Sequence, residues 1–88
     1  MSEVTVEICN RRGLHARAAA KFVKLASEFD AEVKVTKDGQ SVSGDSIMGL
    51  MMLAAGIGSS IDITTDGAQA QEALSALSDL VTNGFDEE

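Results

Sequence analysis

Valine and isoleucine alternate with polar residues in three stretches of the chain, residues 4–9, 32–36 and 61–64. A period of two predicts a β-strand with one buried face. Two other stretches carry apolar residues at spacings of three and four, the period of a helix with one buried face. They predict a helix over residues 16–29 and another over residues 70–81, which Asn83-Gly84 ends.

Turn signals divide the rest of the sequence. Asp38-Gly39 predicts a two-residue hairpin, because both residue types tolerate the positive φ of a primed turn. Residues 40–43 then form its short return strand. Asp45 or Ser46 is the expected N-cap of a short helix over residues 47–53.

The predicted elements run in the order strand, helix, strand, strand, helix, strand, helix. This order indicates an α+β fold with helices on one face of a mostly antiparallel, four-stranded sheet. At 88 residues the chain fits a single domain, residues 1–88, with one modest core. Asp66 is the expected cap of the last helix, and the acidic segment 85–88 is expected to fray.

The charge of the chain is distributed unevenly. The net charge is −7, yet all seven Lys and Arg residues lie between Arg11 and Lys37. Five of them surround or follow His15, the only histidine: Arg11, Arg12, Arg17, Lys21 and Lys24. The acidic total argues against nucleic acid as a partner, since a phosphate backbone needs a basic face. A basic patch on an acidic body predicts an acidic partner instead.

Several further classes are disfavoured. Cys9 is the only cysteine, so we expect no intramolecular disulfide, no metal and no cofactor. The N-terminus lacks the basic and apolar regions of a signal peptide. The apolar stretch 47–57 is broken by glycines and is shorter than the roughly 20 residues that cross a bilayer. A cytoplasmic protein without a membrane partner is the simplest interpretation.

His15 is the candidate reactive residue, because it lies where a predicted strand gives way to a predicted helix. The first N–H groups of a helix have no partner within it, and the macrodipole makes that end partly positive. A phosphate group there meets donors and a favourable field, and Arg12 and Arg17 can add charge-assisted hydrogen bonds. Taken alone, a single histidine beside a glycine is more often an ordinary loop residue.

The short helix over residues 47–53 is apolar on nearly every side. A helix of two turns cannot bury all of its sides. We therefore expect Ile47, Met48 and Met51 to be divided between the core and an exposed contact surface.

Two motifs resemble those of HPr, the histidine phosphocarrier family of the bacterial phosphoenolpyruvate-dependent phosphotransferase system. Gly13-Leu14-His15-Ala16-Arg17-Ala18-Ala19 resembles the family's phosphorylation motif, and Ser46-Ile47-Met48-Gly49-Leu50-Met51 resembles its second signature. The resemblance covers essentially the whole chain. It implies an open-faced β-sandwich, in which three helices cover one face of a four-stranded antiparallel sheet.

The resemblance also implies a phosphocarrier, which is a substrate of two enzymes in succession and not itself an enzyme. His15 would accept a phosphoryl group on Nδ1 from phosphorylated enzyme I and pass it to a histidine of an enzyme IIA. Arg17, Arg12 and the N–H groups of Ala16 and Ala18 would support the phosphate. The carrier is expected to be a monomer. Its expected partner interface consists of Ala20, Lys24, Ile47, Met48 and Met51.

Two positions indicate which branch of the phosphotransferase system the chain serves and how its phosphoryl transfer is regulated. Ala18 stands where the family often has proline, which suits the first turn of a helix. This departure points towards a regulatory or nitrogen-related branch more than towards sugar uptake. Ser46 matches the position that HPr kinase/phosphorylase modifies in some bacteria. A phosphate there would place negative charge on a surface meant for an acidic partner, so transfer from enzyme I should weaken.

Two other classes of protein are alternatives to a phosphocarrier. Asp45-Ser46-Ile47 is similar to the context in which an acyl carrier protein bears pantetheine on a serine. Acyl carriers are helical bundles, however, and the alternating strands oppose that interpretation. A regulatory α/β module without covalent chemistry is the other alternative, and it would not need His15.

Overall fold

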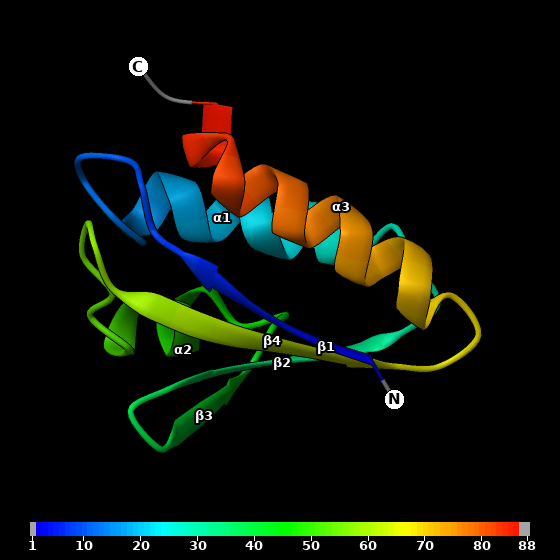
Figure 1. Cartoon of the computed structure of the whole chain (residues 1–88). Helices are drawn as coiled ribbons and strands as arrows, with labels where there is room; N and C mark the ends of the chain where they lie inside the picture. Colours follow the sequence, from blue (N-terminus) through cyan, green and yellow to red (C-terminus); the bar gives the residue numbers. More distant parts are fainter. Residues whose placement is uncertain (1, 87–88) are drawn as a thin grey trace.

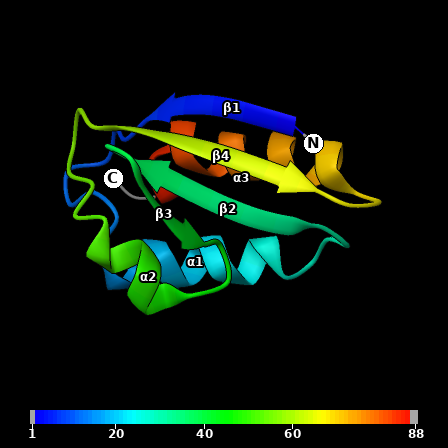
Figure 2. The same ribbon diagram turned by 90° about the horizontal axis from the view of Figure 1, so that it is seen from below.

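The fold is an open-faced β-sandwich in which helices cover one side of an antiparallel sheet (Figure 1, Figure 2). The computed structural model describes residues 2–86. Its elements are β1 (Ser2–Glu7), α1 (Ala16–Ala26), β2 (Glu32–Lys37), β3 (Gln40–Ser43), α2 (Ile47–Met52), β4 (Ser60–Asp66), α3 (Ala70–Thr82) and the 3-10 turn η1 (Gly84–Asp86). The strands are ordered β1-β4-β2-β3, and each neighbouring pair is antiparallel. The predicted fold class is confirmed.

The core lies between the sheet and two helices. α1 and α3 lie side by side across one face, and α2 contacts α1 and the edge strand β3 (Figure 2). On this face Val6 pairs with Ile61 and Val35 pairs with Ile63. All four side chains are buried, together with Phe22 of α1. Burying such apolar surface contributes about 25 cal/mol per Å², the main favourable term in folding.

The opposite face of the sheet is polar. Thr5 Oγ1 donates to Asp62 Oδ1 across β1 and β4 at 2.6 Å, and the hydroxyl groups of Thr36 and Ser41 lie 2.8 Å apart across β2 and β3. Cross-strand pairs of this kind stabilise a sheet face without a second layer. The period of two therefore sorts each strand into one buried and one solvated side.

The predicted ends of two helices are wrong, and one contact joins the two regions concerned. α1 ends at Ala26 and not at Phe29, and α3 has Gln69, not Asp66, at its N-cap position. The N–H of Asp30 donates to Gln69 Oε1 at 2.8 Å, and the carbonyl of Asp30 accepts from the N–H of Gln69 at 2.9 Å. These bonds join the connection after α1 to the start of α3.

β1 also ends two residues before the predicted position, at Glu7. Ile8 continues the pairing outside the strand, since its N–H donates to the carbonyl of Ser59 at 2.7 Å. Cys9 is exposed, and its Sγ lies 3.5 Å from the carbonyl of Val81 and 3.4 Å from that of Thr82. The thiol therefore acts as a weak donor to the last turn of α3.

The start of the C-terminal segment is packed, which contradicts the expectation of a frayed tail for Phe85. Gly84, Phe85 and Asp86 have φ values of 65°, 57° and 60°, which form a left-handed turn. Non-glycine residues avoid this region unless their surroundings hold them there. Phe85 is fully buried in the core, and its carbonyl accepts from Lys21 Nζ at 2.7 Å. Residues 87 and 88 lie outside the described residues.

Candidate functional site

His15 occupies the N-cap position of α1. Its backbone is extended, with φ −80° and ψ −177°, and its carbonyl accepts the first helical hydrogen bond from the N–H of Ala19 at 2.8 Å. The imidazole is partly exposed and makes no capping bond to the helix. The N–H groups of Ala16, Arg17 and Ala18 follow in the first turn, where no helix carbonyl lies four residues behind them. The side chain of the reactive candidate therefore lies outside the core, at the positive end of a helix.

The loop before His15 is closed by three hydrogen bonds. The N–H of Gly13 donates to the carbonyl of Asn10 at 3.1 Å, and Asn10 Nδ2 donates to the carbonyl of Gly13 at 2.8 Å. The N–H of Leu14 donates to the carbonyl of Ala55 at 2.9 Å, which ties the loop to the segment after α2. Asn10 and Leu14 are both buried. Neither Asn10 nor Ala55 was predicted from the sequence to position this loop.

Gly13 is required by the close approach of that segment. Its φ is +66°, and a Cβ atom there would lie 2.5 Å from the carbonyl oxygen of Ala55. Real Cβ atoms are not found so close to a backbone oxygen, and a positive φ disfavours other residues as well. The glycine therefore lets the loop before His15 pass close to the segment after α2.

The basic residues near His15 do not share one role. Arg12 and Arg17 are exposed, one in the turn before His15 and one in the first turn of α1. Ala20 and Lys24 are exposed on the same helix, three and seven positions after Arg17, so the three residues form one face. Lys21 instead bonds the carbonyl of Phe85 and belongs to the fold.

An apolar surface lies next to this face on α2. Ile47, Met48 and Met51 are 40%, 70% and 41% exposed, whereas Leu50 of the same helix is fully buried. The exposed contact surface that was predicted is present, but the predicted division of Ile47, Met48 and Met51 is wrong, because all three are exposed and Leu50 is the residue that α2 buries. Met52 and Ile57, at 66% and 62% exposed, extend the surface and were not predicted. The i+4 spacing of Met52 from Met48 is the signal that would have included it.

Ser46 is the N-cap of α2, one of the two residues predicted for that position. Its Oγ accepts from the N–H of Gly49 at 3.0 Å, which satisfies one donor of the first turn. The side chain is partly exposed. A hydroxyl at this position lies on the same short helix as the exposed methionines.

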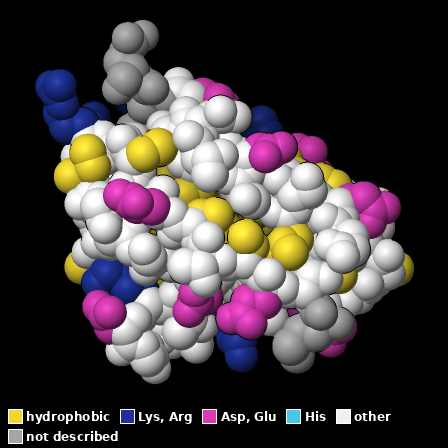
Figure 3. Space-filling model, in the orientation of Figure 1, with side chains coloured by type: hydrophobic (Ala, Val, Ile, Leu, Met, Phe, Trp, Pro, Cys, Tyr) yellow, Lys and Arg dark blue, Asp and Glu magenta, His cyan; other side chains and the backbone are white. Residues whose placement is uncertain are grey.

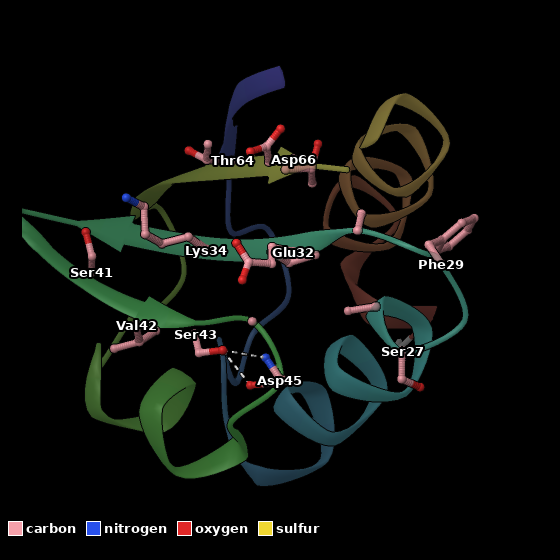
Figure 4. Close-up of a pocket in the computed structure, with 15 residues that line it drawn as sticks. Ser27, Phe29, Glu32, Lys34, Ser41, Val42, Ser43, Asp45, Thr64 and Asp66 are labelled. Carbon is pink, nitrogen blue, oxygen red and sulfur yellow. Dashed lines mark hydrogen bonds between the residues drawn. The ribbon is translucent and has the colours of Figure 1, made fainter. Parts of the chain in front are cut away.

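One hollow of about 590 Å³ lies away from these residues, between the end of α1 and the β2–β3 edge (Figure 4). Its lining includes Glu32, Lys34 and Asp45 but none of the predicted site residues. Within residues 2–86, no group of three or more His, Cys, Asp or Glu is placed to hold a metal ion. No helix in the same range is long and apolar enough to cross a membrane.

The charged side chains on the surface are distributed as unevenly as they are along the sequence. The face shown in Figure 3 carries acidic side chains at several places, with basic side chains mostly towards its margins. The basic residues of α1 and its preceding loop lie next to His15 in the chain, and the sequence after Lys37 has none. The candidate site therefore combines local positive charge with an acidic remainder.

Comparison with known proteins gives a family for this fold and site. The family model described as "PTS HPr component phosphorylation site" matches residues 2–83. The phosphocarrier protein HPr of Neisseria meningitidis is 53% identical, over 99% of this chain and 98% of its own. The phosphocarrier protein NPr of Shewanella violacea is 47% identical, over 97% of this chain and 93% of its own.

Solved structures agree with the sequence comparisons. A crystal structure of HPr from Thermoanaerobacter tengcongensis superposes with a TM-score of 0.95, at 45% identity, covering 100% of this chain and 99% of that one. A second structure from that organism is of an HPr dimer and has a TM-score of 0.78. The chain belongs to the HPr family of phosphocarrier proteins of the phosphotransferase system, a family of carriers and not of independent enzymes.

Replacement of Gly13 tests how tightly the loop is held. Gly13→Ala adds both a disfavoured φ and a collision with the Ala55 carbonyl, whereas Gly58→Ala adds only the disfavoured φ, because nothing lies within 4 Å of its Cβ position. We expect Gly58→Ala to lower the free energy of unfolding by about 1–2 kcal/mol. Gly13→Ala should cost about 1–3 kcal/mol more, the usual penalty of overpacking.

Urea unfolding followed by circular dichroism measures both variants, since the chain has no Trp or Tyr for fluorescence. Equal losses in the two variants would mean that the close approach at Gly13 imposes no constraint of its own.

Proposed function

We propose that this chain carries a phosphoryl group on His15, which it accepts from phosphorylated enzyme I and passes to a histidine of an enzyme IIA. The observation that carries the proposal is the position of His15, partly exposed at the N-cap of α1 with the N–H groups of the first turn beside it. The family supports the general role, since its members are phosphocarriers.

The transfer is an in-line substitution at phosphorus. Nδ1 of a neutral His15 attacks the phosphoryl group, its lone pair forms the new N–P bond, and the bond to the enzyme I histidine breaks. The same exchange, run towards an enzyme IIA histidine, releases the group. Arg17 and the first-turn N–H groups offset the charge on the phosphoryl oxygens. A helix terminus contributes only about 0.3–1 kcal/mol, so the phosphate is supported without being trapped.

The partner surface consists of the exposed face of α1 and the exposed side of α2. Arg17 and Lys24 supply positive charge, Ala20 allows close approach, and Ile47, Met48 and Met51 supply an apolar centre. An apolar centre with a charged rim is the usual anatomy of a protein interface. Since the remainder of the chain is acidic, the basic rim gives acidic partners one preferred orientation.

Phosphorylation of Ser46 is the proposed regulatory step. The hydroxyl lies at the N-cap of α2, where a phosphate would meet the first-turn N–H groups and strengthen the helix. The added charge would face the same acidic partners that Arg17 and Lys24 attract. Regulation would therefore act on docking and leave the fold intact.

The fold argues against the acyl carrier alternative but does not distinguish a phosphocarrier from a non-covalent regulatory module. An acyl carrier is a helical bundle, and the four-stranded sheet opposes that class directly. A non-covalent regulatory module shares the fold and differs only in the role of His15. Relatives named HPr and NPr both match the chain, so a panel of enzymes IIA from the sugar and nitrogen branches is the measurement that assigns the branch.

Replacement of the only histidine tests the covalent step. Incubation with enzyme I, phosphoenolpyruvate and magnesium should add one acid-labile phosphate to the native chain and none to His15→Ala. Ser46→Ala is the matched control and should label fully, because it removes the other candidate acceptor and keeps the imidazole. Intact mass spectrometry before and after acid treatment measures both. Labelled His15→Ala protein would place the phosphate elsewhere and contradict the proposal.

Arg17→Ala should slow transfer from phosphorylated enzyme I by about tenfold, since a charge-assisted hydrogen bond is worth about 1.5–3 kcal/mol. Lys34→Ala is the control, because it removes an exposed positive charge from β2 instead of from the first turn of α1. Initial transfer rates and thermal unfolding of both variants make the measurement. If the two variants transfer at the same rate, Arg17 has no special part in the site.

A charged residue at position 46 should imitate the regulatory phosphate. Ser46→Asp keeps an N-cap acceptor and adds charge, whereas Ser46→Asn keeps the acceptor and adds none. Only the aspartate variant should slow transfer from enzyme I, by about fivefold, with both variants as stable as the native chain. Initial rates of phosphoryl transfer from enzyme I measure the first effect, and thermal unfolding measures the stability of both variants. A similar loss in Ser46→Asn would assign the effect to side-chain shape and not to charge.

A further inference from the structure

The methionines that the structure describes all lie on one exposed face of α2. Met48, Met51 and Met52 are separated by three and four positions, which places them on the same side of the helix. Their side chains are 70%, 41% and 66% exposed. We call these three residues the thioether face. Methionine is otherwise a common gap-filler in cores.

The core between residues 2 and 86 contains no sulfur. Its buried members are aliphatic residues, alanine and phenylalanine, and the one cysteine is exposed. An oxidant therefore meets sulfur only at the surface of the described structure. Susceptibility of a thioether follows its exposure, so the thioether face reacts while the fold-forming side chains do not.

The geometry points to a modification site: we propose that oxidation of the thioether face to methionine sulfoxide reversibly switches off docking to enzyme I and enzyme IIA. The proposal rests on the function proposed above, because the thioether face includes Met48 and Met51 of the partner surface. The oxidants are hydroperoxides. A thioether sulfur loses two electrons and gains one peroxide oxygen, the O–O bond breaks, and the other oxygen leaves as water or alcohol. A dithiol reductase reverses the step, giving the thioether, a disulfide and water.

The effect on docking follows from polarity. A sulfoxide oxygen is a strong hydrogen-bond acceptor, and an interface centre built for thioethers offers it no donor. Burying an unsatisfied acceptor weakens binding, whereas the free carrier keeps the oxygen in water at no cost. The helix itself stays anchored, because Leu50 and Leu53 are buried and the Ser46 Oγ holds the first turn. The modification therefore acts on partner binding and not on stability.

The same side chains suit a carrier with two different partners. Methionine is unbranched and polarizable, so one surface can repack against several shapes. Leucine would give a similar apolar area without oxidisable sulfur. The three methionines that allow the surface to bind two different partners therefore also carry the sulfur atoms that a hydroperoxide oxidises.

The experiment uses the full chain with Cys9→Ser, which removes the competing thiol and retains a donor towards the Val81 carbonyl. The protein is treated with hydrogen peroxide, and peptide mass spectrometry maps the sulfoxides. We expect oxygen at positions 48, 51 and 52, an unchanged thermal midpoint, and a KM for transfer from enzyme I raised by about tenfold with little change in kcat. Methionine sulfoxide reductases A and B with dithiothreitol should restore the original KM.

The control variant is Met48→Leu/Met51→Leu/Met52→Leu in the same background, compared with its own untreated sample. Peroxide should leave its KM unchanged, although the variant retains Met1. If peroxide raises the KM of this variant equally, the target lies elsewhere and the proposal is wrong. If the native thioether face is fully oxidised and its KM stays the same, the methionines only consume oxidant. An untreated chain that accepts no phosphate from enzyme I would instead overturn the proposed function itself.

Discussion

Direct contact between Gly13 and the Ala55 carbonyl is the constraint on which the site depends. The contact brings the loop before α1 against the segment after α2, and the bond from the N–H of Leu14 to the Ala55 carbonyl fixes it. Asn10 closes the loop from the other side. With both attachments made, the chain enters α1 with His15 at the N-cap. Two short backbone segments thus place an imidazole at a helix end without any dedicated scaffold.

The distribution of charge complements that placement. In the proposed function, the positive end of α1 and the arginines beside it meet the incoming phosphoryl group, while the acidic residues are spread along the rest of the chain. The apolar side of α2 lies next to this charge because α2 packs against α1. In the proposed function, the residues of the transfer step and those of the partner surface therefore lie next to one another on α1, its preceding loop and α2. The polar open face of the sheet carries none of them.

The sequence was sufficient wherever a local pattern decides the structure. Period-two alternation gave the strands, Asp38-Gly39 gave the hairpin, and Ser46 gave the cap of α2, because each signal acts within a few residues. It failed where distant residues decide. The connection after α1 is bonded to Gln69, thirty-nine positions after Asp30, and no local pattern signals that contact. The role of Ala55 in holding the loop leaves no trace in its residue type, and Phe85 was mistaken for part of a tail because an acidic run follows it.

The left-handed turn at Gly84–Asp86 folds the last described residues back onto the core. Phe85 is fully buried in the core, the 3-10 turn η1 that carries it contacts α1 and α3, and Lys21 holds its backbone. Removing residues 85–88 would therefore open a cavity in the core, because Phe85 would be lost. Fusion partners and labels should follow residue 86, so that Phe85 remains in the core.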